Sequence, residues 1–395
     1  MSRPHSKLAA IVTSYRKHSD AQHIVDRFLY GYGWSGMHHQ PEIDVVSLFI
    51  DQAEAGDLSR SRAAQFPSMK IYPTIAEAVT LGTSKLAVDG VMIIAEGGLY
   101  ARNEKGQWMY PRWEFFEQVV KVFKDSGRSV PIFNDRHLSW NWDWARQMYD
   151  TSREMDFAYM AGSSVSVTWR IPSVEMPMGS HVREALCVGY GDIDSDDFRA
   201  LEAIQCMVER RHGGETGVKW VQAYQGDKFW SAMSAGIWSR RLMNAALCRS
   251  HTLTPARFSF NDIFPTDSEM RRLINDPIAY QYEHTDGLKC TMLLMNGLVQ
   301  DFNFAADVEG MHEPLSTQMY LPATDGLASY FSALVNHMEK MYLTGKSPYP
   351  VERTLLATGV TSAGVESLYH SQTRYKTPHL AIKYHPAQNS TFERT

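Results

Sequence analysis

The sequence predicts an α/β protein of two domains, with a parallel sheet covered by helices first and an α+β domain with a large, mainly antiparallel sheet second. The length of 395 residues suits two cores of ordinary size. Short apolar runs alternate with amphipathic segments up to Gly162, which is typical of a parallel sheet with helices on both faces. Beyond that residue the chain becomes Pro-rich and then strand-like. We therefore expect domains over residues 1–161 and 162–395.

Six apolar runs in the first domain are expected to be buried strands: residues 8–12, 45–50, 69–73, 89–95, 129–133 and 157–162. Amphipathic helices are expected between them, over residues 21–28, 60–66, 74–80, 113–126 and 142–154. Right-handed crossovers place the carboxyl ends of all these strands at one edge of the sheet, where ligands of such sheets bind.

The second domain should contain helices over 196–211, 229–247, 327–342 and 351–369, and a last strand over 379–384. Between residues 280 and 321 the pattern predicts an antiparallel meander. Asp286-Gly287 and Asn296-Gly297 are typical of tight hairpin turns, because both central positions of such turns favour positive φ.

Composition excludes several classes of protein. A formal net charge of −5 argues against a nucleic-acid partner. No apolar run reaches the roughly 18–20 residues that cross a bilayer, and the run LAAIV near the start is short for a secretion signal. The four cysteines are scattered without a CxxC pair, so we expect no zinc site and a reduced, cytoplasmic protein.

The order of these landmarks resembles the Gfo/Idh/MocA family of oxidoreductases. MKIYPTIAEAV resembles the third strand and following helix of that family, DGVMIIA its fourth strand, and GKSPYPVERTLLATGVTSAGVESLYHS its closing helix. The resemblance implies a Rossmann-like N-terminal domain that binds NAD or NADP, a sugar, cyclitol or sugar-derived acid as substrate, and a homo-oligomer formed through the C-terminal sheet.

The loop after the first strand departs from the family pattern. Relatives carry a GxGxxG-type loop there, whereas this chain has TSYRKHS, which contains no glycine. Ser14, Arg16 and Lys17 can hold a diphosphate by their side chains instead. Alternatively, the loop is a solvated basic turn over a sheet that no longer binds NAD. Ser19 and Gln22 fit a capping box, so a helix should begin there.

Further residues at the same edge are candidates for the cofactor site. Asp51 ends the second strand, where an acidic residue accepts hydrogen bonds from the ribose of NAD, although a plain turn residue is also common there. Glu96, Gly97 and Gly98 follow the fourth strand, where the backbone passes close to a ligand. The insertion 102–113 can cover that edge.

The expected catalytic residues follow the fifth strand. Asp135, Arg136 and His137 stand where family members carry Glu-Lys-Pro. Arginine keeps the positive charge of the lysine but cannot act as an ordinary base, so Arg136 would orient the substrate while His137 moves the proton. His137 can equally be a surface or capping residue.

The second domain supplies the remaining candidates. Arg199 aligns with the histidine that acts on the substrate hydroxyl in relatives, and the aspartates around it, Asp197 among them, favour a helix start more than a metal site. Ser163, Trp169, Arg170 and Asp197 are the expected substrate contacts.

We keep three hypotheses on function. The first is an NAD(P)-linked oxidoreductase that acts on a carbohydrate-like substrate. The second is a non-redox lyase, isomerase or hydrolase on such a substrate, working with or without a metal ion. The third is a catalytically inactive relative that binds a ligand.

Overall fold

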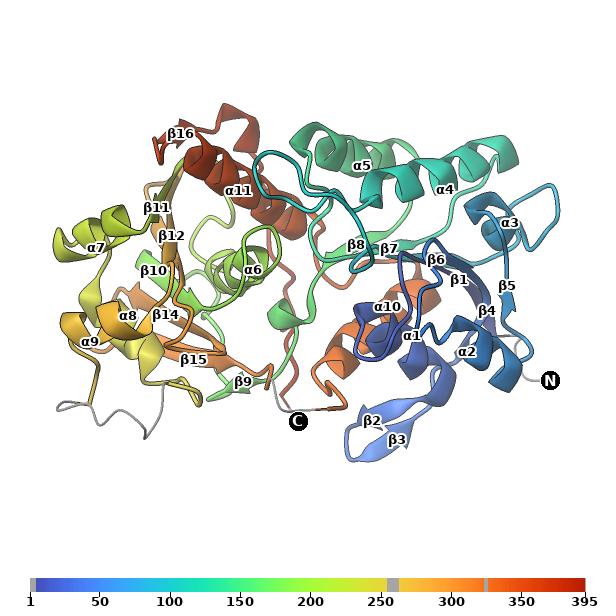
Figure 1. Ribbon diagram of the computed structural model, residues 1–395, viewed down its shortest axis with the longest axis horizontal. Helices are drawn as coiled ribbons and strands as arrows, with labels where there is room; N and C mark the ends of the chain where they lie inside the picture. Colours follow the sequence, from blue (N-terminus) through green and yellow to red (C-terminus); the bar gives the residue numbers. More distant parts are fainter. Residues whose placement is uncertain (1–4, 254–262, 323–325, 395) are drawn as a thin grey trace.

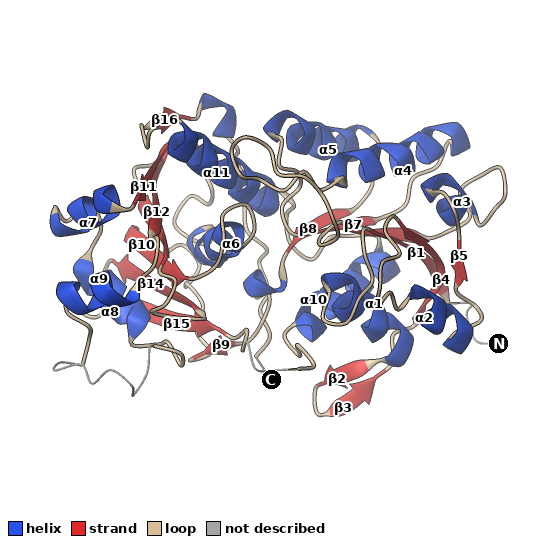
Figure 2. Cartoon of the chain, in the orientation of Figure 1, coloured by secondary structure: helices blue, strands red, loops and turns tan. Residues whose placement is uncertain are grey.

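The computed structural model describes residues 5–253, 263–322 and 326–394 and places two domains side by side (Figure 1). A parallel sheet with helices above and below forms the N-terminal domain, and a larger sheet with helices on both faces forms most of the C-terminal domain (Figure 2). The predicted fold class is thus confirmed. Within the described ranges, no helix combines the length and apolar character that a membrane span requires.

The N-terminal sheet has six parallel strands in the order β5-β4-β1-β6-β7-β8. Strands β4 and β5 are added on one side of β1, and β6, β7 and β8 on the other, so the order of addition reverses between β1 and β6. That reversal marks the place where ligands bind to such sheets. All six strands overlap the predicted apolar runs, although both residues of β5 are exposed where a buried strand was expected. The strands are β1 Ser6–Val12, β4 Ile43–Ile50, β5 Lys70–Ile71, β6 Gly90–Ile94, β7 Ile132–Asp135 and β8 Tyr159–Gly162.

Successive side chains of β1 point to opposite faces of the sheet and are buried on both. Ala9 and Ile11 face one helical layer, while Leu8, Ala10 and Val12 face the other. The five helices predicted for this domain are present: α1 Asp20–Tyr30, α2 Ser59–Gln65, α3 Ile75–Thr80, α4 Arg112–Ser126 and α5 Trp142–Glu154.

One helix of the N-terminal layer comes from the far end of the chain. Helix α10, Phe331–Thr344, lies beside α1 under the first sheet (Figure 1). Tyr342 contacts Gly90 and donates a hydrogen bond of 2.8 Å to Val91 O. The chain therefore returns to the first domain after building the second.

A small hairpin between α1 and β4 was not expected from the sequence. Strands β2, Tyr32–Trp34, and β3, Met37–His39, pair antiparallel around the turn Ser35-Gly36. The glycine-rich and histidine-rich segment lacks an apolar alternation that would reveal it. His39 Nε2 lies 2.7 Å from the Glu339 carboxylate of α10, which ties the hairpin to the domain.

The C-terminal sheet has eight strands in the order β16-β11-β12-β13-β10-β14-β15-β9. The expected meander is wrong at one point, because β10 inserts between β13 and β14 and runs parallel to β13. Strands β10 and β11 were not expected from the sequence. The strands are β9 Arg170–Ile171, β10 Val182–Gly189, β11 Val218–Gln225, β12 Ile278–His284, β13 Lys289–Leu294, β14 Phe302–Val308, β15 Leu315–Met319 and β16 Tyr375–Lys376.

One predicted helix and one predicted strand of this domain differ from the structure. The helix expected over 229–247 is two helices, α7 Asp227–Ser234 and α8 Arg240–Leu247, because Gly236 has φ +70° and Ser239 caps a new start. Residues 378–380 form a 3₁₀ turn where a strand over 379–384 was expected. The other helices are α6 Asp196–Val208, α9 Asp267–Leu273 and α11 Glu352–Tyr369.

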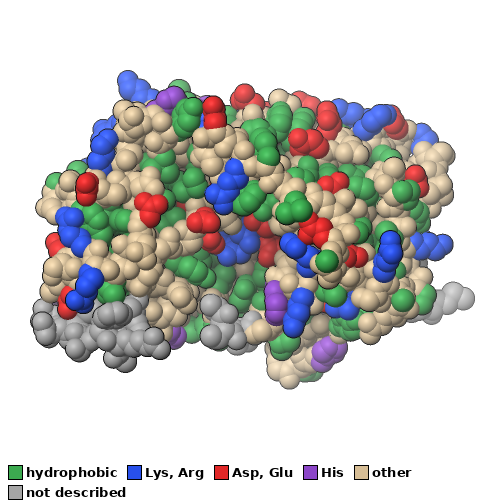
Figure 3. Space-filling model, viewed as in Figure 1, with side chains coloured by type: hydrophobic (Ala, Val, Ile, Leu, Met, Phe, Trp, Pro, Cys, Tyr) green, Lys and Arg blue, Asp and Glu red, His purple; other side chains and the backbone are tan. Residues whose placement is uncertain are grey.

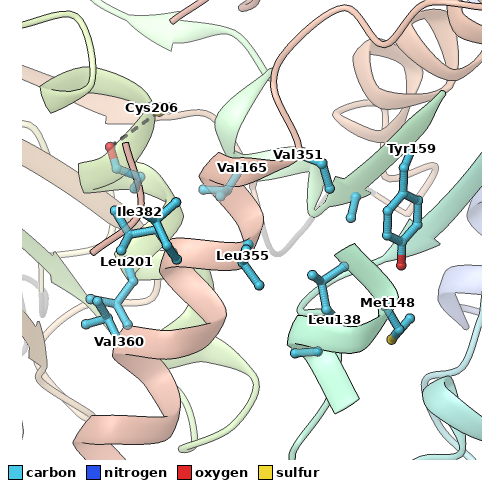
Figure 4. Packing of buried hydrophobic residues seen from close by; sticks show 14 of the residues in the cluster. Leu138, Met148, Tyr159, Val165, Leu201, Cys206, Val351, Leu355, Val360 and Ile382 are labelled. Carbon is cyan, nitrogen blue, oxygen red and sulfur yellow. Dashed lines mark hydrogen bonds between the residues drawn. The ribbon is translucent and has the colours of Figure 1, made fainter. Parts of the chain in front are cut away.

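A continuous apolar core joins the two domains. Leu138 and Met148 of the first domain belong to the same buried cluster as Leu201 of α6 and Leu355 of α11 (Figure 4). This shared core fixes the edge of the N-terminal sheet against the start of α6. The candidate active site lies at that junction.

The contact between α10 and the first sheet can be tested at Gly90. A Cβ there would lie 2.4 Å from the Tyr342 ring and 2.6 Å from Leu8, so Gly90→Ala should lower the free energy of unfolding by about 1–3 kcal/mol. Gly33→Ala is the control, because no atom lies within 4 Å of a Cβ there. Urea denaturation measures both, and equal stabilities would contradict the packing described.

Candidate active site

The site begins where β1 ends. The backbone of Thr13 continues the sheet by donating to Ile94 O at 3.2 Å, and its hydroxyl donates to Glu96 O at 3.0 Å. Ser14 follows and is 1% exposed, and its Oγ has no hydrogen-bond partner among the described residues. A buried hydroxyl without a partner is costly in a protein interior, so Ser14 Oγ is suited to a ligand at this edge.

Helix α1 starts next to this hydroxyl. Ser19 caps it, because Ser19 Oγ accepts from Gln22 N at 3.2 Å. The predicted capping box is only half present, since the Gln22 side chain accepts from His18 N and not from Ser19 N. Asp20 opens the helix, where the positive end of the helix dipole stabilises its carboxylate.

A cleft of about 510 Å³ opens above the ends of β1 and β6. Five of the seven predicted cofactor residues line it, which are Ser14, Arg16, Lys17, Glu96 and Gly97. The other lining residues are His18, Ser19, Asp20, Ala55, Gly56 and Tyr110. The edge predicted from the topology is therefore an open cleft rimmed by both basic and acidic side chains.

The remaining two cofactor candidates lie beside the cleft. The Asp51 carboxylate accepts a hydrogen bond from the Tyr100 hydroxyl. Gln52 accepts from Leu99 N at 2.7 Å, and a Cβ at Gly98 would lie 2.9 Å from the same Gln52 oxygen. Glycine at position 98 thus allows the loops after β4 and β6 to meet.

A line of buried charges crosses the floor of the site. Arg112 forms an ion pair with Glu96, whose other oxygen lies 3.8 Å from Arg136 Nε. Arg136 pairs with Asp20 at 2.9 Å and donates to Ser195 Oγ at 2.8 Å. Arg136 thereby connects the first sheet, α1 and the second domain.

Arg136 combines a strained backbone conformation with a fixed positive charge. It has φ +62°, a left-handed conformation that is rare outside glycine, and such strain is concentrated at functional sites. Burial lowers the pKa of its guanidinium, but Asp20 and Glu96 outweigh burial and raise the pKa well above the ordinary value. The group is therefore a fixed cation that can orient a ligand but cannot accept a proton.

Asp135 and Asp20 form a carboxyl pair beside this cation. Burial and the neighbouring Asp20 raise the pKa of Asp135 well above the ordinary value. Burial also acts to raise the pKa of Asp20, but Arg136 and Arg199 outweigh it and hold that pKa below the ordinary value.

His137 points into the protein. Its side chain is 1% exposed, and its Nε2 lies 3.0 Å from Asp194 O and 3.2 Å from the Arg112 guanidinium. Burial and Arg112 lower its pKa well below the ordinary value, so the ring is neutral. His137 is not among the cleft residues, and its surroundings fit an internal hydrogen-bonding role better than proton exchange with a substrate.

The second domain faces the site with the start of α6. Arg199 pairs with Asp196 at 3.1 Å, and its buried Nε has no partner among the described residues. Charged side chains of both signs gather on the surface where the domains meet (Figure 3). Arg199 lies close enough to Asp20 of the first domain to lower the pKa of the Asp20 carboxyl.

The four predicted substrate residues do not converge on the cleft. Ser163 Oγ donates to Glu202 at 2.6 Å, and Asp197 is buried and accepts from Tyr280 at 3.1 Å. Arg170 packs over the Phe392 ring at 4.0 Å, while Trp169 and Arg170 line a separate hollow of about 470 Å³. Ser163 and Asp197 are internal to the C-terminal domain.

The aspartates before and at the start of α6 are dispersed among different partners. Asp194 accepts from Gln107 at 3.1 Å, and Asp196 and Asp197 lie in the first turn of the helix. Within residues 5–253, 263–322 and 326–394, no three His, Cys, Asp or Glu side chains come together as metal ligands.

Three residues of the site were not predicted from the sequence: Asp20, Tyr110 and Arg112. Asp20 and Arg136 are separated by 116 residues, and no local pattern links them. Tyr110 and Arg112 belong to the insertion expected to cover the edge, and the insertion does bridge the domains through Gln107–Asp194.

The buried Asp194 gives a test of the electrostatics. Burial and then Asp197 raise its pKa from 3.8 to about 8. When folding raises the pKa of an acid, the folded protein loses stability as pH rises from the unfolded pKa to the folded pKa. The loss is at most about 1.4 kcal/mol per pH unit. Asp194→Asn should therefore match wild type near pH 4 and become increasingly more stable up to pH 8. Asparagine also accepts the φ of +66° at this position.

Urea denaturation across that pH range measures the effect, with the exposed Asp192→Asn as control. A stability difference between Asp194→Asn and wild type that does not change with pH would contradict the raised pKa.

Comparisons with known proteins bear on this architecture. No protein-family profile matches the sequence. No curated protein matches it in sequence either. Solved structures do match in three dimensions over nearly the whole chain.

GenD2 from gentamicin A biosynthesis, solved with NAD, aligns with a TM-score of 0.56 at 10% identity, covering 95% of this chain and 97% of its own. Myo-inositol dehydrogenase from Lactobacillus casei, solved with NAD(H) and myo-inositol, aligns at 0.55 and 10% identity, covering 94% and 96%. Apo scyllo-inositol dehydrogenase from the same organism aligns at 0.56 and 8% identity, covering 95% and 99%. The chain therefore has the two-domain fold of the Gfo/Idh/MocA-type dehydrogenases.

Proposed function

We propose that the protein is an NAD(P)-linked oxidoreductase that acts on a carbohydrate-like substrate, such as a sugar, cyclitol or sugar-derived acid. The observation that carries the proposal is the unpartnered Ser14 Oγ beneath the cleft at the ends of β1 and β6. The fold shared with GenD2 and the inositol dehydrogenases, two of which were solved with NAD or NAD(H), supports the same assignment.

The cleft residues fit a diphosphate without a glycine-rich loop. Ser14 Oγ can donate to a phosphate oxygen, and a Cβ at Gly97 would lie only 3.2 Å from it, so glycine keeps the approach open. Arg16 and Lys17 supply positive charge, although Arg16 also pairs with Glu54 at 2.9 Å. Side chains would thus replace the backbone amides that hold the diphosphate in glycine-rich loops.

Asp51 fits the ribose. Its carboxylate already accepts from Tyr100, but an ionised carboxylate accepts several hydrogen bonds, so a ribose hydroxyl can donate as well. The same negative charge opposes a 2′-phosphate, which favours NAD over NADP. Arg199 and Ser195, from the second domain, lie where they can contact the substrate beside Arg136.

The bound dinucleotide would accept or donate a hydride, which is chemistry that no side chain provides. Arg136 would hold the substrate oxygen as a permanent cation, kept in place by Asp20, Glu96 and Ser195. Since neither Arg136 nor the buried His137 is placed to exchange a proton, another group must do so.

Calorimetric titration tests cofactor binding directly. We expect heat with NAD⁺ and NADH, and weaker binding of NADPH because of Asp51. Ser14→Ala should weaken NAD⁺ binding about tenfold or more, since a hydrogen bond to a charged group contributes about 1.5–3 kcal/mol. Ser61→Ala, on the exposed face of α2, is the matched control and should bind as wild type does. Absence of binding by all three dinucleotides would refute the proposed function.

A further inference from the structure

Two carboxyl groups meet at the inner end of the cleft. Asp20 lies at the start of α1 and lines the cleft, and Asp135 ends β7 immediately before Arg136, which pairs with Asp20 at 2.9 Å. Asp135 is 2% exposed, and its buried Oδ2 receives no hydrogen bond from any donor in the described part of the chain. The two side chains are close enough to hydrogen-bond to each other.

This arrangement requires a proton. Ionised carboxylates only accept hydrogen bonds, so two of them in contact would leave both facing oxygens without a donor. They would also repel each other strongly in a site with little water to screen them. One proton removes both problems, because the Asp135 hydroxyl then donates to the Asp20 carboxylate. The raised pKa of Asp135 and the lowered pKa of Asp20 agree with the proton residing on Asp135.

Charged and titratable groups of both domains face the pair. From the first domain come Arg136, Glu96 and His23, and from the second come charged and phenolic groups on or near three helices. These second-domain groups are Arg199 and Asp196 on α6, Tyr330 before α10 and Tyr349 before α11. The cations Arg136 and Arg199 favour loss of the proton when the pair donates it, whereas Glu96 opposes that loss.

We propose that Asp20 and Asp135 share one proton and are the proton donor and acceptor of this site. The proposal deepens the proposed oxidoreductase function and rests on it for its catalytic part. In reduction of a carbonyl, the dinucleotide would supply the hydride to the substrate carbon. The ionised Asp20 would take the proton from Asp135 and pass it to the substrate oxygen, which leaves both carboxyl groups ionised. A proton from solvent would then return to Asp135 after the product leaves. Oxidation of the alcohol runs the same transfers in reverse.

The geometry favours this pair over the other candidates. Asp20 lines the cleft, whereas His137 does not, and Arg136 cannot release its proton. The pair also occupies the sheet edge at which the dinucleotide is expected to bind. Asp20 is therefore the group through which a buried proton reaches the cleft.

Infrared spectroscopy detects the shared proton without substrate or cofactor. A protonated carboxyl has a carbonyl band separate from carboxylate bands, so the wild type minus Asp135→Asn difference at pH 7 should contain one such band. Asp20→Asn should abolish the same band, because the amide introduced at position 20 can donate to Asp135 and let it ionise. Asp194→Asn is the control, since it removes a different buried carboxyl and should leave the Asp135 band unchanged.

Two infrared results would overturn the shared proton. Absence of the band in the wild-type protein would show that Asp135 is ionised. Persistence of the band in Asp20→Asn would show that burial alone protonates Asp135. Near-ultraviolet circular dichroism confirms that each variant is folded before its spectrum is interpreted.

Calorimetry in two buffers of different ionisation enthalpy tests the link to the cofactor. Binding of NAD⁺, which carries a positive ring, should release a fraction of a proton from wild type and none from Asp135→Asn. Equal proton release by both proteins would refute the catalytic role. Failure of NAD⁺ to bind at all would refute the proposed function and the catalytic role with it, while the infrared band would still decide whether the proton is shared.

Discussion

The ion pair between Arg136 and Asp20 is the interaction on which the site depends. It joins the end of β7 to the start of α1, and Arg136 extends the contact to Glu96 and to Ser195 of the second domain. Buried charges are costly unless paired, so these groups must keep their present positions or lose stability. These contacts link the two domains beside the cleft, in addition to the apolar core that they share. Any ligand that enters there meets a preorganised set of charges.

The absence of a glycine-rich loop changes how the cleft can recognise an anion. In glycine-rich loops the backbone amides contact the phosphates, and the identity of the side chains matters little. Here Ser19 caps the helix start, Asp20 lies in the first turn, and the donors at the cleft are the side chains of Ser14, Arg16 and Lys17. Binding an anion through flexible side chains such as those of arginine and lysine costs more conformational entropy than binding it through a rigid loop.

Much of the fold could be predicted from the sequence, and the reasons are local. A strand buried on both faces is a continuous apolar run, which locates β1, β6 and β8 of the first sheet, whereas both residues of the edge strand β5 are exposed. The edge that carries Ser14 and Gly97 then follows from topology alone. The position of β10 between β13 and β14 could not be predicted, because strand order depends on contacts far apart in the chain. The same holds for Asp20 and Arg112, whose partners Arg136 and Glu96 are brought to them only by folding. Ser163 and Asp197 were predicted to contact the substrate, and both form hydrogen bonds within the protein interior that the sequence does not reveal.

The return of α10 to the first sheet has a consequence for biosynthesis. The apolar underside of β1 and β6 is covered by α10, whose last residue is Thr344, so the ribosome must have made most of the chain before that face can be sealed. Until then α1 packs against this face without α10, and incompletely covered apolar surface favours aggregation. The N-terminal domain is therefore completed late, and its maturation is coupled to that of its neighbour.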